Sequence, residues 1–97
     1  MRKLKAILPG EILEKEFLSP LDVSQRRLAQ DIGVPHGRIN QIVRGLRGIT
    51  ADTALRLAHY FGSSPRFWMN LQAHYDLQVE EDRIGAKVRR LKALKAA

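Results

Sequence analysis

The segment from Gln25 to Arg44 constrains the fold more than any other part of this chain. Its apolar spacing predicts two helices of about eight residues, joined by Ile32-Gly33-Val34-Pro35. A connection this short makes the two helices cross steeply. Such a crossing needs a small residue in the first helix, which Ala29 supplies, and a turn residue that tolerates positive φ, which Gly33 supplies. The angle between the helices is then filled by apolar side chains, namely Leu28, Ile32, Val34, Ile39 and Ile42.

This pattern is typical of a helix-turn-helix, in which the second helix enters the major groove of DNA. A purely structural helical hairpin would show part of the same pattern. The charge favours DNA, because residues 24–49 contain five arginines and only one acid, Asp31. Of the chain's formal net charge of +7, this segment contributes +4 and residues 79–97 contribute +3. A positive field of this kind favours a polyanionic partner such as double-stranded DNA.

The buried positions of the second helix determine which of its side chains face outward. With Ile39, Ile42 and Val43 inward, the polar residues of this helix face the groove or flank it. Asn and Gln can bond bidentately to adenine and Arg to guanine, so Asn40 and Gln41 are the first candidates for base contacts. Arg38 and Arg44 suit either bases or phosphates, and the start of the first helix and the following loop suit phosphates. The predicted DNA-binding residues are Gln25, Arg26, Arg27, His36, Arg38, Asn40, Gln41, Arg44 and Arg47.

The rest of the chain also shows helical spacing, which predicts an all-α protein of five to six helices. We expect a basic N-terminal tail over residues 1–8, a DNA-binding domain over 9–78 and a C-terminal helix within 79–97. Caps and breakers mark the helix ends: Pro9-Gly10 and Ser19-Pro20 bound the first helix, Ser24 and Thr50 cap later ones, Gly62 ends one, and Ser64-Pro65 begins another. A separate basic helix is expected from about Glu80 to Leu94.

Several classes of function are excluded by what the sequence lacks. The 97 residues suit one domain, and no apolar run or N-terminal pattern predicts a membrane span or a signal peptide. The absence of cysteine excludes disulfides and thiolate zinc sites and fits a cytoplasmic location. The three histidines are too far apart for a metal pair, and no phosphate loop is present. We therefore expect no enzyme activity, no catalytic residues, no metal site and no cofactor.

Three further segments identify a resemblance: Leu8-Pro9-Gly10-Glu11-Ile12-Leu13, Gly48 through Ala58, and Ser64 through Leu77 with its Phe67-Trp68-Met69-Asn70-Leu71-Gln72 run. Together they resemble the HigA-type (VapI-like) antitoxins within the Cro/C1-type (XRE), lambda-repressor-like helix-turn-helix class. The resemblance covers about residues 8–78. The family more often has His before the Pro-Gly-Glu segment, and Leu8 departs from this.

The resemblance implies a homodimer that binds a palindromic operator in its own promoter and neutralises a HigB-like toxin, an mRNA endonuclease of the RelE type. A stand-alone repressor without a toxin, and a protein-interaction module that does not bind DNA, remain as alternatives. The acids of the first helix are candidates for toxin contact, namely Glu11, Glu14 and Glu16. The dimer candidates are Trp68, Leu71, Ile84, Val88 and Leu91, although Trp68 and Leu71 also suit the core.

Overall fold

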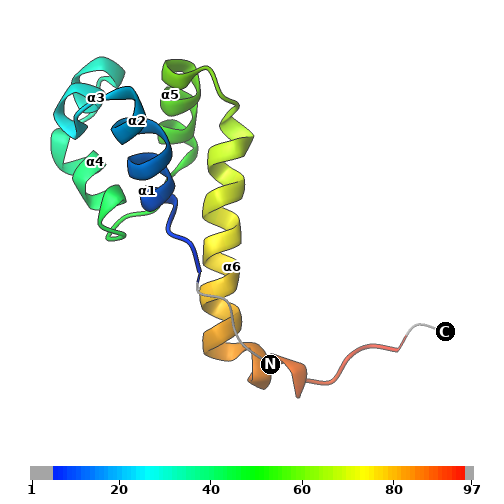
Figure 1. The fold of residues 1–97 in the computed structure, drawn as a ribbon. Helices are drawn as coiled ribbons and strands as arrows, with labels where there is room; N and C mark the ends of the chain where they lie inside the picture. The colour runs from blue at the N-terminus through cyan, green and yellow to red at the C-terminus, as the bar shows by residue number, and fades with distance from the viewer. Residues whose placement is uncertain (1–5, 96–97) are drawn as a thin grey trace.

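The computed structural model describes residues 6–95, and every regular element in that range is helical (Figure 1). The N-terminal elements follow one another without a break and form one rod: α1 (Pro9–Ile12), the π-helical η1 (Leu13–Leu18) and α2 (Ser19–Leu21). The remaining helices are α3 (Gln25–Ile32), α4 (His36–Val43), α5 (Ala51–Phe61) and α6 (Pro65–Arg89). The all-α prediction is confirmed.

Local side-chain and backbone signals begin and end these helices as predicted. The hydroxyl oxygens of Ser24, Thr50 and Ser64 accept backbone N–H groups in the first turns of α3, α5 and α6, at 3.0, 3.5 and 3.1 Å. Gly33 and Gly62 end α3 and α5 in the left-handed conformation, with φ of 73° and 72°. Each of these signals acts within a few residues, which is why the sequence alone predicts them.

The end of the N-terminal rod differs from the prediction. Helical structure continues through Ser19 and Pro20 to Leu21, and the chain leaves the helix at Asp22, whose φ is 55°. In the π turn that precedes Pro20, the Ser19 N–H donates to the Glu14 carbonyl five residues back. This wider turn accommodates a proline ring that would collide with the carbonyl four residues back in a regular α-helix.

The predicted separate helix over residues 80–94 is also wrong, because α6 runs unbroken from Pro65 and ends at Arg89. The acids near residue 80 pair along the middle of this helix instead of beginning a new one. Arg83 Nη2 donates to Glu80 Oε2 at 2.8 Å, and hydrogen bonding with Arg83 lowers the pKa of the Glu80 carboxyl. Ion pairs three residues apart stabilise a helix interior. The expected boundary between residues 78 and 79 therefore falls inside α6.

The core lies between the N-terminal rod and α3, α4, α5 and the first half of α6. Trp68 is fully buried, and its indole N–H donates to Ser63 Oγ at 2.9 Å. The second half of α6 extends away from this body (Figure 1). The Cα radius of gyration is accordingly 16.6 Å, against about 13 Å for a compact chain of 100 residues. Within residues 6–95, no helix has the length and apolarity needed to cross a membrane.

Candidate nucleic-acid interface

The hairpin of α3 and α4 has the geometry that its sequence predicts. Gly33 turns the chain with positive φ, and the Val34 N–H then donates to the Ala29 carbonyl at 3.0 Å. Ala29 is 2% exposed, and Ile39 and Ile42 of α4 are buried beneath the hairpin. The inner face of α4 is therefore held in the core, and its other face is left at the surface.

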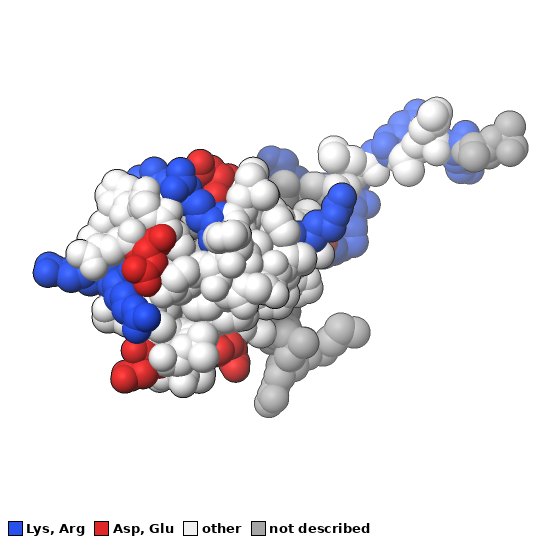
Figure 2. All heavy atoms as spheres, turned by 90° about the horizontal axis from the view of Figure 1, so that it is seen from above, with Lys and Arg blue, Asp and Glu red and all other residues white. Residues whose placement is uncertain are grey.

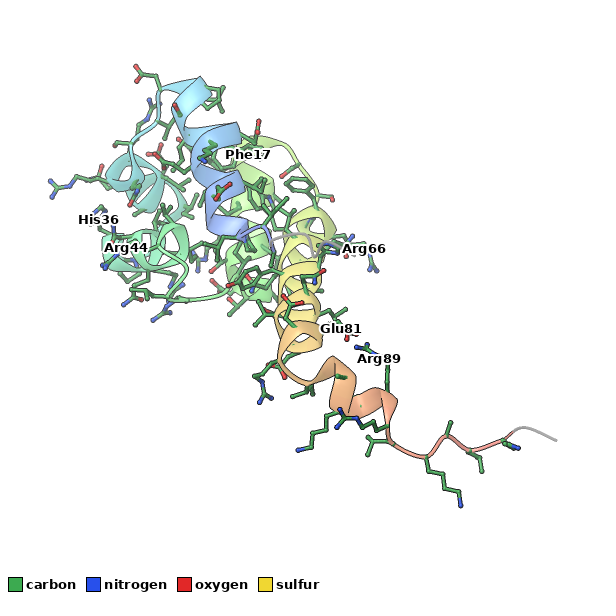
Figure 3. All side chains as sticks on the ribbon, turned by 60° about the horizontal axis from the view of Figure 1, so that its bottom comes forward. Phe17, His36, Arg44, Arg66, Glu81 and Arg89 are labelled. Atoms are coloured by element: carbon green, nitrogen blue, oxygen red, sulfur yellow. The ribbon has the colours of Figure 1, made fainter. Side chains whose placement is uncertain are left out.

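The predicted DNA-binding residues lie on this outer surface. His36, Gln41 and Arg44 are exposed, and Arg38 and Asn40 are half-buried. Figure 3 shows His36 and Arg44 on the outer side of the hairpin, on the side of the molecule away from α6. Arg26 and Arg27 are exposed in the first turn of α3, and Arg47 is exposed in the loop after α4. Seen from above, basic side chains project from the rim of the body and along the C-terminal segment (Figure 2).

Two side-chain pairs orient the candidates for base contact. Asn40 Nδ2 donates to Gln25 Oε1 at 3.3 Å, which joins α4 to the start of α3. Arg47 Nε donates to Gln41 Oε1 at 3.0 Å, which joins the following loop to α4. Each bond leaves polar groups of Asn40 and Gln41 available, and each restricts the rotamers that these side chains sample before DNA arrives.

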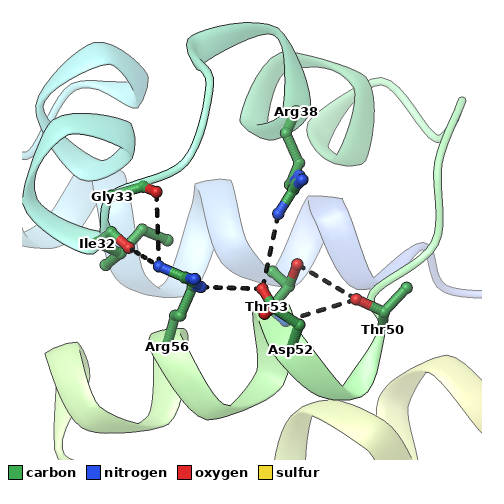
Figure 4. Close-up of polar contacts among 7 residues, drawn as sticks. All are labelled: Ile32, Gly33, Arg38, Thr50, Asp52, Thr53 and Arg56. Carbon is green, nitrogen blue, oxygen red and sulfur yellow. Dashed lines mark hydrogen bonds and ion pairs between the residues drawn. The ribbon is translucent and has the colours of Figure 1, made fainter.

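A third contact involves two residues of α5 that were not among the sequence-predicted site residues. Asp52 Oδ1 accepts from Arg56 Nε at 2.9 Å and lies 3.6 Å from Arg38 Nη1 (Figure 4). Arg56 Nη1 also donates to the Ile32 carbonyl at 2.7 Å, at the end of α3. The sequence places Asp52 four residues before Arg56, and that spacing predicts their pairing. No spacing within a single helix predicts that Arg38 of α4 also contacts Asp52.

The hairpin is also held from behind by the N-terminal rod and by α6. Gly10 packs directly on the last turn of α4: a Cβ added there would lie 2.0 Å from the Ile42 carbonyl oxygen. Gln72 Oε1 accepts the backbone N–H of Ile49 at 2.7 Å, in the loop between α4 and α5. Gln72 therefore ties α6 to the loop that follows α4, whereas Asn70, two residues earlier on α6, is exposed.

Known proteins share this arrangement. A sequence profile of the helix-turn-helix family matches residues 15–68. Virulence-associated protein I of Dichelobacter nodosus is 52% identical over 81% of this chain and 73% of its own length. Antitoxin HigA-1 of Vibrio cholerae is 33% identical over 97% of this chain and 90% of its own length. The Pseudomonas aeruginosa antitoxin HigA, solved with the higBA promoter, is 42% identical with a TM-score of 0.90, over 94% of this chain and all of that one. The chain belongs to the HigA-type helix-turn-helix family.

Membership of the HigA family confirms the resemblance that the sequence showed, together with the lambda-repressor-like fold and its long C-terminal helix. It also makes this protein a non-enzymatic member of a DNA-binding antitoxin family.

The residues considered for a dimer contact in this HigA-type chain fall into two groups. Trp68 has no exposed surface and Leu71 is half-buried against the core, so both pack within the chain. Both residues therefore belong to the core, and the fully buried Trp68 cannot form a dimer surface. Ile84, Val88 and Leu91 lie on the projecting part of the chain, where Val88 is 47% and Leu91 is 66% exposed.

The three acids considered for toxin contact do not form one uniform patch. Glu11 is exposed and pairs with Lys15, at 3.6 Å between Oε2 and Nζ. Glu14 is half-buried, with Oε2 buried and without a hydrogen-bond partner. It lines a cleft of about 320 Å³ that also contacts Ser24 and Arg27 at the start of α3. Glu16 is exposed. Glu14 therefore lies beside the start of the hairpin.

Proposed function

We propose that this protein is an antitoxin that represses its own operon and neutralises a HigB-like mRNA endonuclease. One observation supports the DNA-binding half most directly. The hairpin has the fold of a HigA protein that was solved with its promoter, and its outer surface presents Gln41, Arg44 and Arg47 on a segment of net charge +4. The proposed partner is the operator in the protein's own promoter, which implies action in the cytoplasm.

The proposed DNA contacts fall into two classes. Asn40, Gln41 and Arg38 are positioned on α4 for base edges, where a bidentate contact contributes about 1–3 kcal/mol of discrimination. Gln25, Arg26, Arg27 and Arg47 flank α4 and are proposed to contact phosphates, which position the protein without reading sequence. His36 and Arg44 lie at the two ends of α4 and suit either class.

We also propose that a homodimer reads an inverted repeat. A single hairpin contacts few base pairs, and a two-fold axis doubles the readout and matches a palindrome. The half-sites would then lie about 34–36 Å apart. The proposed seam uses Ile84, Val88 and Leu91, joined by Leu77, which precedes Ile84 by one heptad and is 71% exposed.

The DNA-binding proposal is tested by titrating labelled duplexes of the promoter and of a scrambled sequence. Gln41→Ala and Arg38→Ala are each expected to weaken promoter binding by about 1–3 kcal/mol, with little change on the scrambled duplex. Arg66→Ala is the matched control, because it removes one exposed arginine from α6, outside the hairpin (Figure 3). Equal losses on both duplexes would assign the residue to phosphate contact, and no loss for either variant would refute the placement of α4.

The proposed neutralisation of a toxin is tested by co-expression of this protein with the adjacent open reading frame. Rescue of growth and co-purification of the two products are expected. A neighbouring product that is neither toxic nor bound would leave a stand-alone repressor as the function.

A further inference from the structure

Asp52 lies in a cleft beside α4 whose charged lining side chains are mainly positive. The cleft has a volume of about 360 Å³ and lies between the hairpin turn, the start of α4 and the start of α5. Three arginines line it, Arg38, Arg47 and Arg56, and Asp52 is the one carboxylate among the lining residues. Its side chain is 58% exposed, so it is accessible from solvent and from any duplex bound at this face.

Two of these arginines depend on Asp52 to different degrees. Arg56 is anchored independently of Asp52, because its Nη1 donates to the backbone carbonyl of Ile32 at 2.7 Å (Figure 4). Arg38 has no other partner of this kind among the contacts seen in residues 6–95, and its Nη1 lies 3.6 Å from Asp52 Oδ1. Removal of the carboxylate would therefore release Arg38 while Arg56 keeps its bond to the turn.

We infer that Asp52 is a specificity-determining residue: it holds Arg38 of α4 in one orientation and keeps that arginine from binding phosphate on any duplex. An arginine held by a neighbouring carboxylate loses less conformational freedom when it meets its base. The same carboxylate repels phosphates, which weakens sequence-independent binding. Asp52 would thus raise the ratio of operator to random affinity without touching a base. This inference rests on the proposed operator binding.

The test compares Asp52→Asn with the wild type on operator and random duplexes over a range of salt concentrations. Asparagine keeps an oxygen that accepts from Arg56 and removes the charge that holds Arg38. On the random duplex we expect tighter binding and a salt slope steeper by about 0.9, because Arg38 then neutralises one more phosphate. The ratio of operator to random affinity is expected to fall about tenfold, within the range that one bidentate base contact contributes.

Asp22→Asn is the matched control. It makes the same change in net charge, but Asp22 is exposed at the end of the N-terminal rod and pairs with no arginine among the contacts of residues 6–95. Arg38→Ala and the Arg38→Ala/Asp52→Asn double variant complete the set. Without Arg38, removal of Asp52 is expected to leave the random-duplex salt slope unchanged. Thermal melting of each variant verifies that it is folded at the assay temperature.

Three results would overturn the inference: an unchanged slope and ratio in Asp52→Asn, an equal change in Asp22→Asn, or the full Asp52→Asn effect without Arg38. If Asp52→Asn does not fold, Arg38→Ala tests the same pair. It should leave the wild-type salt slope on random DNA unchanged, and a slope shallower by about 0.9 would refute the holding role. A wild type that shows no operator preference would refute the proposed function, and the random-duplex measurements would still decide the role of Asp52.

Discussion

Gly10 offers a sharp test of how the N-terminal rod positions α4. Its Cα faces the last turn of α4, where an added Cβ would lie 2.0 Å from the Ile42 carbonyl oxygen and 2.7 Å from Val43 Cα. These atoms belong to the backbone, so no side-chain rotation relieves the overlap. Gly10→Ala therefore forces α1 and α4 apart or prevents these two helices from packing together.

The size of the effect follows from the contact. Ordinary van der Waals separation begins near 3.4 Å, so the Ile42 carbonyl must retreat by about 1.4 Å from its distance of 2.0 Å. Overpacking in a core costs about 1–3 kcal/mol, and alanine returns at most about 1 kcal/mol through its better helix propensity. Because the overlap is with backbone atoms, the cost falls at the upper end of this range, and the net loss is about 2 kcal/mol. Such a loss would lower Tm by about 8–16 °C in a domain of this size.

Chemical and thermal denaturation measure the stability change, and promoter titration measures the displacement of α4. Gly37→Ala is the matched control, since an added Cβ there meets nothing within 4 Å. It lies in α4 and is expected to leave stability unchanged or raise it by up to about 1 kcal/mol. Wild-type stability together with wild-type promoter affinity in Gly10→Ala would refute the reasoning.

Three further predictions concern other surfaces. Gln72→Leu leaves the Ile49 N–H without its acceptor and should cost about 1–3 kcal/mol in urea unfolding; an unchanged midpoint would contradict this role. Val88→Asp should convert a dimer to a monomer in analytical ultracentrifugation, whereas Ala86→Asp on the opposite side of α6 should not; a wild type that sediments as a monomer at micromolar concentration argues against the seam. Arg38→Ala should still rescue cells from the toxin, because the candidate toxin contacts Glu11, Glu14 and Glu16 lie on the N-terminal rod and Arg38 lies on α4; loss of rescue by a folded variant would show that the toxin contacts α4 as well.

Elements whose signals act over a few residues could be predicted from the sequence. The turn at Gly33 and the caps at Ser24, Thr50 and Ser64 depend on bonds between near neighbours, so their residue types and spacing were sufficient. The outward-facing residues of α4 could also be predicted from the sequence, because burial of Ile39 and Ile42 determines which positions of this helix remain at the surface. Charge at Glu80 and its neighbours misled the prediction of α6, since acids stabilise a helix interior through pairing as well as a helix start.

Contacts between segments far apart in the sequence could not be predicted in this way. The approach of Gly10 to Ile42 and the bond from Ile49 to Gln72 depend on where whole helices come to rest. The pairing of Arg38 with Asp52 likewise requires α4 and α5 to meet at one end. No pattern within a single helix contains that information, because a long side chain such as arginine reaches whichever partner the packed helices bring within its range.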